Sequence, residues 1–153
     1  MRGRLMRLQE VGLSVSVICG DRGYGDRLRE CGLDVVQIPF AREIEPWTDM
    51  RCLWALRRAL RDGNYDIVDS HNPKGTLLGP VAGQLAKVKA VVHTVHGFLF
   101  NENSRGLHRI AAEGAERWCA RWSDDLLFQS REDFDYARAH GYKKSDRLHL
   151  IGN

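Results

Sequence analysis

Residues 66–98 read DIVDSHNPKGTLLGPVAGQLAKVKAVVHTVHGF, which is a short apolar run, a longer helical stretch and a second apolar run in succession. The two short runs, Asp66–Ser70 and Ala90–Val95, are rich in β-branched residues and do not alternate strictly between polar and apolar positions. A strand that is covered on both faces has this pattern. The stretch therefore predicts two parallel strands that are joined by a helix over Gly75–Ala86.

The same alternation continues on both sides of this stretch. Four further strands are predicted at Ser14–Cys19, Asp34–Ile38, Asp125–Phe128 and Leu148–Ile151. Five further helices are predicted at Arg4–Val11, Tyr24–Cys31, Thr48–Arg61, Leu107–Trp122 and Arg131–His140. Alternation of this kind predicts a doubly wound, Rossmann-like α/β fold with a parallel sheet and helices on both faces.

Composition narrows the class of protein. The 153 residues are enough for one domain, and the 43% that are apolar are enough for a core. The net charge of +3, from 23 basic and 20 acidic residues, is too weak to argue for nucleic-acid binding. No stretch is apolar enough for a transmembrane helix, and the N-terminus lacks the apolar run of a signal peptide. The four cysteines lie far apart without zinc-ligand spacing, which predicts free thiols in a reducing cytosol and no metal site.

Three predicted strands end in polar side chains, and ligands of parallel α/β sheets bind beyond the carboxyl ends of strands. His71, Asn72 and Lys74 follow the strand at Asp66–Ser70, just before a helix N-terminus that suits a phosphate or a sugar hydroxyl. A polar turn that contains Pro73 would explain the same residues.

The second strand end is His96-Gly97-Phe98, where the glycine allows a sharp turn and leaves the imidazole at the rim of the sheet. His93 has the opposite parity on the strand and is predicted to be structural. At the third strand end, Ser130 is predicted to cap a helix first and to contact a ligand second.

Two helices carry further signals. Glu113 and Glu116 share a helix face and read as a solvated pair. Leu53, Leu56 and Leu60 mark the core side of the helix at Thr48–Arg61. Its outer face is either simply basic or a surface for an anionic membrane, and the second interpretation rests on Trp47, Arg51, Trp54 and Arg58.

Taken together, these stretches resemble the N-terminal, acceptor-side domain of family 4 glycosyltransferases of the GT-B fold. The likeness is carried by residues 66–75, 91–98 and 116–133, and by Ile151-Gly152-Asn153, which is similar to the start of the "GNG" hinge into the second domain of that family. It spans essentially all of residues 1–153, which are expected to form one partial Rossmann-like domain.

The resemblance implies a retaining, metal-independent transferase that moves a sugar from a nucleotide sugar, such as a UDP- or GDP-sugar, to an acceptor. The acceptor would be a sugar or a lipid-linked sugar in the synthesis of a cell-surface polysaccharide or glycolipid. The transferase would work in the cytoplasm or on the inner face of the membrane, without a resident cofactor. His96 maps to a histidine in the active cleft, and His71–Lys74 map to a loop that faces the acceptor.

The sequence departs from the family at both ends. The first strand with its glycine-rich loop and the donor-binding C-terminal domain are absent, so the chain alone is expected to be inactive. The strands at Ser14–Cys19 and Asp66–Ser70 would then either flank an empty slot or pair directly. Half of a sugar-nucleotide epimerase of the same fold and a non-catalytic, flavodoxin-like binding module remain as alternatives.

Overall fold

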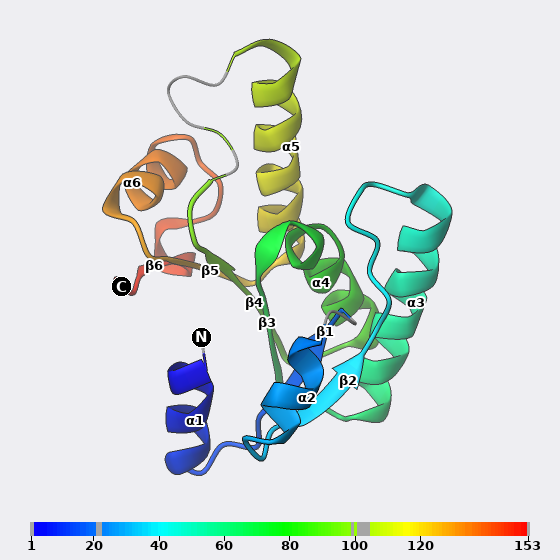
Figure 1. Cartoon of the computed structure of the whole chain (residues 1–153). Coiled ribbons are helices and arrows are strands. Elements are labelled where there is room, and N and C mark those ends of the chain that lie inside the picture. The colour runs from blue at the N-terminus through cyan, green and yellow to red at the C-terminus, as the bar shows by residue number, and fades with distance from the viewer. Residues whose placement is uncertain (1, 21–22, 99, 101–104, 153) are drawn as a thin grey trace. The chain divides into compact units, whose positions relative to one another are not determined.

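The computed structural model describes residues 2–20, 23–98, 100 and 105–152. The chain forms two compact units, Met1–Ala55 and Leu56–Asn153, and the helix α3 crosses the boundary between them. The elements are shown in Figure 1, and their order along the chain is α1 (Arg2–Glu10), β1 (Ser16–Cys19), α2 (Tyr24–Arg29), β2 (Asp34–Gln37), α3 (Pro46–Asp62), β3 (Ile67–Ser70), α4 (Asn72–Ala86), β4 (Ala90–Val95), α5 (Gly106–Trp122), β5 (Asp125–Phe128), α6 (Arg131–Ala139), a 3-10 turn (Ser145–Arg147) and β6 (Leu148–Leu150).

The first unit contains a parallel pair of strands, β1 and β2, with Ser16 opposite Asp34. The helix α2 packs on β2, and the Arg29 guanidinium of this helix donates to the Val35 carbonyl oxygen over 3.2 Å. Along α3, Cys52, Leu56 and Leu60 share one face and are buried. The helix extends into the second unit, to which Leu56 and Leu60 belong. Of the three leucines that the sequence assigned to the core side, Leu56 and Leu60 are buried and Leu53 is half-buried.

The second unit contains a four-stranded parallel sheet in the order β3-β4-β5-β6. Neighbouring strands of this sheet are joined through α4, α5 and α6 in turn, and each connection steps in the same direction across the sheet. Right-handed connections of this kind place the three helices on the same face of the sheet. The packing agrees, because Ala120 of α5 and Ala137 of α6 are in one buried cluster with Val95, Leu126 and Phe128.

Glycines bring α4 unusually close to that face of the sheet. A Cβ atom on Gly79 would lie 2.7 Å from the Cβ of Ser70, and one on Gly83 would lie 2.8 Å from Val68 Cγ1. Only a residue without a side chain fits at such a distance. The close approach fixes the first turn of α4 beside the carboxyl end of β3.

The predicted α/β architecture is confirmed, since every strand pairing is parallel and helices flank the sheets. All six predicted strands are present, with bounds that shift by two residues at most. They form two sheets, however, and not one continuous sheet. Among the strands that the structure describes, β3 pairs only with β4 and β1 pairs only with β2, so direct pairing of β1 with β3 does not occur.

Candidate functional site

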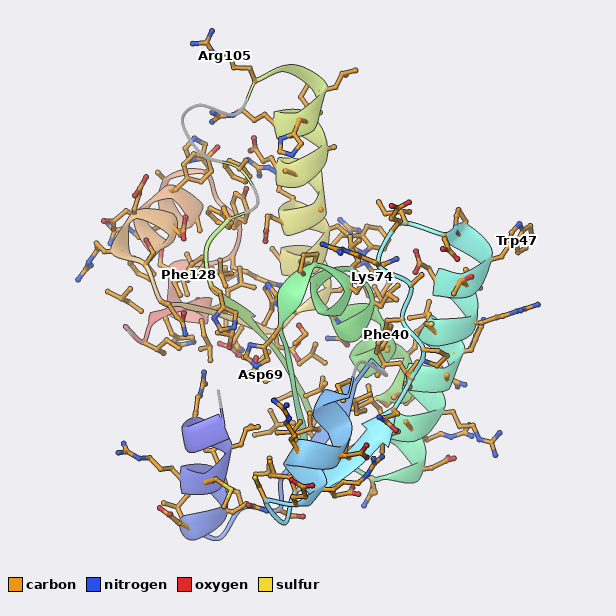
Figure 2. The ribbon with its side chains drawn as sticks, viewed as in Figure 1. Phe40, Trp47, Asp69, Lys74, Arg105 and Phe128 are labelled. Carbon is orange, nitrogen blue, oxygen red and sulfur yellow. The ribbon has the colours of Figure 1, made fainter. Side chains whose placement is uncertain are left out.

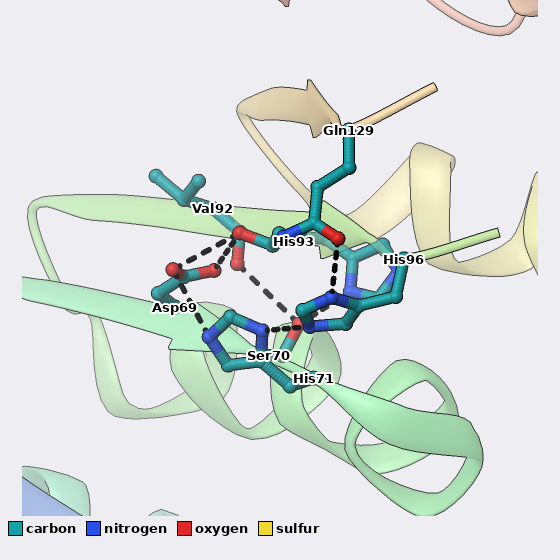
Figure 3. A network of polar contacts seen from close by, with 8 residues as sticks. Asp69, Ser70, His71, Val92, His93, His96 and Gln129 are labelled. Carbon is teal, nitrogen blue, oxygen red and sulfur yellow. Dashed lines mark hydrogen bonds and ion pairs between the residues drawn. The ribbon is translucent and has the colours of Figure 1, made fainter. Parts of the chain in front are cut away.

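Two histidines meet where β3 and β4 end. The register that places Ser70 opposite His93 brings the residues after both strands to one edge of the sheet. There His71 Nδ1 lies 2.9 Å from His96 Nε2, and the two ring centroids are 5.1 Å apart (Figure 3). His96 is exposed, whereas the His71 side chain is only 21% exposed. The sequence placed both residues at this edge, and the structure shows that they touch.

Three further side chains extend this pair into a continuous network. His71 Nε2 lies 3.1 Å from Asp69 Oδ2, and Thr94 Oγ1 donates to both oxygens of the Asp69 carboxylate over 2.9 and 3.1 Å. At the other end, His96 Nδ1 lies 3.0 Å from the amide oxygen of Gln129 (Figure 3). We call these five residues, Thr94, Asp69, His71, His96 and Gln129, the strand-end network.

A second polar pair lies beneath the network. Ser70 Oγ is 2.9 Å from His93 Nδ1, and both side chains are buried. Burial lowers the pKa of His93 to about 4, although a Ser70 hydrogen bond and the Asp69 carboxylate act in the opposite direction. His93 is therefore uncharged at neutral pH. A buried, neutral histidine that bonds to a neighbouring strand matches the structural role predicted for it.

A cavity of about 120 Å³ opens beside the network. Pro73 and Thr76 from the start of α4 line it, together with Glu116 from α5 and the end of β4 from His93 to Gly97. Gly97 has a φ of +149°, a left-handed backbone conformation that glycine adopts without strain. The imidazole, hydroxyl and carboxyl groups around this small cavity can form hydrogen bonds to one hydroxyl group of a ligand.

Several predicted site residues have other partners. Phe98 packs in an aromatic cluster, stacked on Phe100 with ring centroids 5.0 Å apart and against Phe128, Tyr136 and Tyr142. Ser130 caps α6 by accepting a hydrogen bond from the Asp133 amide over 3.4 Å. Lys74 lies in the first turn of α4, half-buried and outside the lining of the cavity. The Asn72 side chain lies outside what the structure describes.

The structure also adds residues that sequence reasoning missed. Glu116 is only 5% exposed, so the predicted solvated pair with Glu113 is wrong, and Glu113 pairs with Arg117 over 3.0 Å instead. Asp69 and Thr94 could have been found together, because adjacent parallel strands place them on the same face of the sheet. Gln129 directly follows β5, and this place at a third strand end was its signal.

The sequence pattern of the family described as "Glycosyl transferase 4-like domain" matches residues 5–153. Among curated proteins, the chain is 29% identical over 140 residues to the UDP-Gal:alpha-D-GlcNAc-diphosphoundecaprenol alpha-1,3-galactosyltransferase of Escherichia coli. That alignment covers 91% of the chain but 36% of the relative, so the chain spans about a third of the relative's length.

Two solved structures share the fold. HepE of Anabaena, in complex with UDP and glucose, superposes with a TM-score of 0.63 at 14% identity, over 89% of this chain and 36% of its own. MurG of Acinetobacter baumannii superposes with a TM-score of 0.64 at 14% identity, over 97% of this chain and 39% of its own. At this identity the likeness establishes the Rossmann-like fold alone.

Proposed function

Because the chain belongs to the family of glycosyl transferase 4-like domains, we propose that it is the acceptor-side part of a glycosyltransferase. This enzyme transfers a sugar from a nucleotide sugar to a hydroxyl of a lipid-linked acceptor in polysaccharide or glycolipid synthesis. The curated relative, whose name contains a UDP-sugar donor and a diphosphoundecaprenol-linked acceptor, supports this proposal. The family match favours a transferase over the epimerase half and the flavodoxin-like module.

The proposed reaction defines what this part of the enzyme has to do. The acceptor oxygen bonds to the anomeric carbon, and the bond from that carbon to the diphosphate oxygen breaks. The departing diphosphate keeps the electron pair of that bond and takes up the hydroxyl proton. An acceptor that is held in the reactive orientation reacts faster because its freedom is restricted before the barrier is reached. This chain supplies that orientation through His96 and the neighbouring cavity. The nucleotide sugar is a co-substrate, and transfer proceeds with retention and without a metal ion or resident cofactor.

The observation that carries the proposal is the meeting of His71 and His96 at the carboxyl edge of the sheet, beside the cavity. The test is sugar transfer by the complete polypeptide, with UDP- and GDP-sugars as donors and sugar-diphosphoundecaprenol as acceptor. We expect His96→Ala to lower kcat by about 100-fold, as for a group that acts on a transferred proton or its oxygen. We also expect no transfer by residues 1–153 alone.

A matched control is His149→Ala, because His149 is also exposed and also pairs with an aspartate, Asp125, at 2.8 Å. This variant should keep the full rate, since His149 is not part of the strand-end network. Unchanged turnover in His96→Ala would contradict the proposal, as would the absence of transfer from every nucleotide sugar.

We further propose that the outer face of α3 contacts an anionic membrane on its cytoplasmic side. Trp47 is 86% exposed and Trp54 is 51% exposed, and they share this face with Arg51 and Arg58. Figure 2 shows the Trp47 side chain projecting away from the helix. Exposed indole rings together with arginines are typical of helices that lie in a membrane interface. None of the described helices combines the length and the hydrophobicity needed to cross a bilayer.

Co-sedimentation with vesicles tests the membrane contact. Binding of the complete polypeptide should be stronger to phosphatidylglycerol vesicles than to phosphatidylcholine vesicles and should weaken as salt screens the charges. Arg51→Glu with Arg58→Glu should remove this preference, while Arg147→Glu on the 3-10 turn is the control. Equal binding of the double variant and the unchanged protein would contradict the proposal.

A further inference from the structure

The strand-end network contains more acceptor sites than two neutral imidazole rings can satisfy. A ring nitrogen without hydrogen would set its lone pair against the Asp69 carboxylate at 3.1 Å, so His71 Nε2 has to carry a hydrogen. One hydrogen is shared between the rings, where His71 Nδ1 and His96 Nε2 are 2.9 Å apart. The Gln129 amide oxygen only accepts, so His96 Nδ1 needs a third hydrogen at 3.0 Å. Two neutral rings provide two.

Building on the proposed function, we infer that Asp69 and His71 are positioning residues that hold His96 as a hydrogen-bond donor. The two rings then share three hydrogens and one positive charge. Asp69 orients His71, and His71 in turn fixes which nitrogen of His96 faces away from the rings. In this arrangement the nitrogen of His96 that faces outward, Nδ1, carries a hydrogen.

The surrounding charges are consistent with this assignment. The Asp69 carboxylate on β3 lies at one end of the network, and the single Thr94 hydroxyl hydrogen on β4 is shared between its two oxygens. Glu116 from α5 is 5% exposed and lines the same cavity as His96. His93 on β4 is uncharged at neutral pH because burial lowers its pKa to about 4. The Asp69 carboxylate, 3.1 Å from His71 Nε2, is thus the negative charge that faces the two rings most directly among the contacts that the structure describes.

The assignment changes the role of His96 in the proposed reaction. A general base needs a nitrogen without hydrogen to take the acceptor proton, and here both nitrogens of His96 are engaged within the protein. A substrate oxygen that displaces the Gln129 amide would instead receive a hydrogen bond from Nδ1. His96 would therefore orient or polarise a substrate oxygen by donating to it, and the acceptor proton would pass to the leaving diphosphate.

Nuclear magnetic resonance of the ¹⁵N-labelled chain directly tests how many hydrogens the His71 and His96 rings carry. Two-bond proton–nitrogen correlations at neutral pH distinguish ring nitrogens with and without a hydrogen. We expect one bare nitrogen among the four of His71 and His96 in the unchanged chain, at the position that accepts the shared hydrogen between the rings. In Asp69→Asn, a near-isosteric change, we expect a second bare nitrogen in this pair, and Gln129→Leu should produce the same loss of a hydrogen by removing the other acceptor. Asp125→Asn removes the aspartate beside His149 and should leave both rings unchanged.

A second bare nitrogen in the unchanged chain would overturn the inference, because it would mean that the Gln129 amide donates through its NH₂ group. Unchanged ring signals in Asp69→Asn would overturn it as well.

Turnover of the complete polypeptide gives the second readout. Asp69→Asn should lower kcat by about tenfold with little change in KM, less than the loss expected for His96→Ala.

The two hypotheses fail in different ways. If the polypeptide transfers no sugar although three hydrogens are found, the proposed function is wrong and the hydrogen count stands. If it transfers sugar and the pair holds two hydrogens, the positioning role is wrong and the proposed function stands.

Discussion

The buried state of His93 predicts that acid destabilises the fold in a defined pH range. Burial lowers the pKa of His93 from 6.5 to about 4 in the folded chain. The unfolded chain therefore binds a proton at a higher pH than the folded chain does. The stabilisation that follows is fully present above pH 6.5 and is lost as the pH falls toward 4.

The size of the effect follows from the two pKa values. A difference of about 2.5 units corresponds to roughly 3 kcal/mol between the limits of the range, at about 1.4 kcal/mol per unit. At about pH 5 the unfolded histidine is almost fully protonated while the folded one is mostly neutral, and roughly 2 kcal/mol has been lost. Such a loss is a large share of the about 5–15 kcal/mol by which a typical domain is stable.

Urea unfolding of the chain at a series of pH values measures this loss. His93→Gln keeps a polar side chain toward Ser70 but does not titrate, so its stability lacks the contribution from His93. The difference in unfolding free energy between the unchanged chain and this variant should shrink by roughly 2 kcal/mol from about pH 8 to about pH 5. Other groups titrate in the same range, and taking the difference cancels them.

The control is His149→Gln, which alters an exposed histidine of β6. The acid-dependent loss of stability should persist in this control. If the His93→Gln variant loses stability with acid as steeply as the unchanged chain does, burial does not hold His93 neutral and the reasoning fails.

Three further predictions concern packing and reactivity. Gly79→Ala places a Cβ atom 2.7 Å from that of Ser70, so it should lower the unfolding free energy by about 1–3 kcal/mol. At Gly114 an added Cβ meets nothing within 4 Å, so Gly114→Ala should raise the unfolding free energy slightly. The midpoints of urea unfolding measure both changes. Lys87 ends α4 with a φ of +60°, so Lys87→Gly should raise the melting temperature by removing backbone strain of about 1 kcal/mol, and an unchanged or lower value would contradict this. Burial raises the pKa of Cys119 to about 12, so this thiol should resist alkylation in the native chain and react once the chain unfolds, as mass spectrometry of labelled peptides would show.

Local sequence signals were sufficient for most of the fold. The strands were found to within two residues because apolar, β-branched runs are bounded by polar turns, and these properties depend on neighbours in the sequence. The convergence of His71 and His96 also followed from the sequence, because parallel strands bring their carboxyl ends to one edge. Whether β1 and β3 pair directly stayed open in the sequence, because it depends on pairing between distant segments.

The remaining parts of the site depend on three-dimensional packing. Phe98 reads as a site residue beside Gly97, but in the structure its ring joins an aromatic cluster that helices distant in sequence complete. Glu116 reads as solvated from its helix face, yet that face lies against the cavity. The link from His96 to Gln129 joins side chains that are 33 positions apart. A contact between residues so far apart in the sequence cannot be predicted from a local sequence pattern.

Among the strands that the structure describes, β3 pairs only with β4 and so forms one edge of the four-stranded sheet. Asp69 lies on this strand, and its side chain is 29% exposed, so water screens its attraction to His71. Two unit charges about 4 Å apart interact by about 1 kcal/mol in bulk water and about 4 kcal/mol at an effective dielectric constant of about 20. A ligand or a protein segment that covered Asp69 would displace that water and move the Asp69–His71 contact from the first regime toward the second. Covering this edge would then strengthen the contact without any change in the residues that form it.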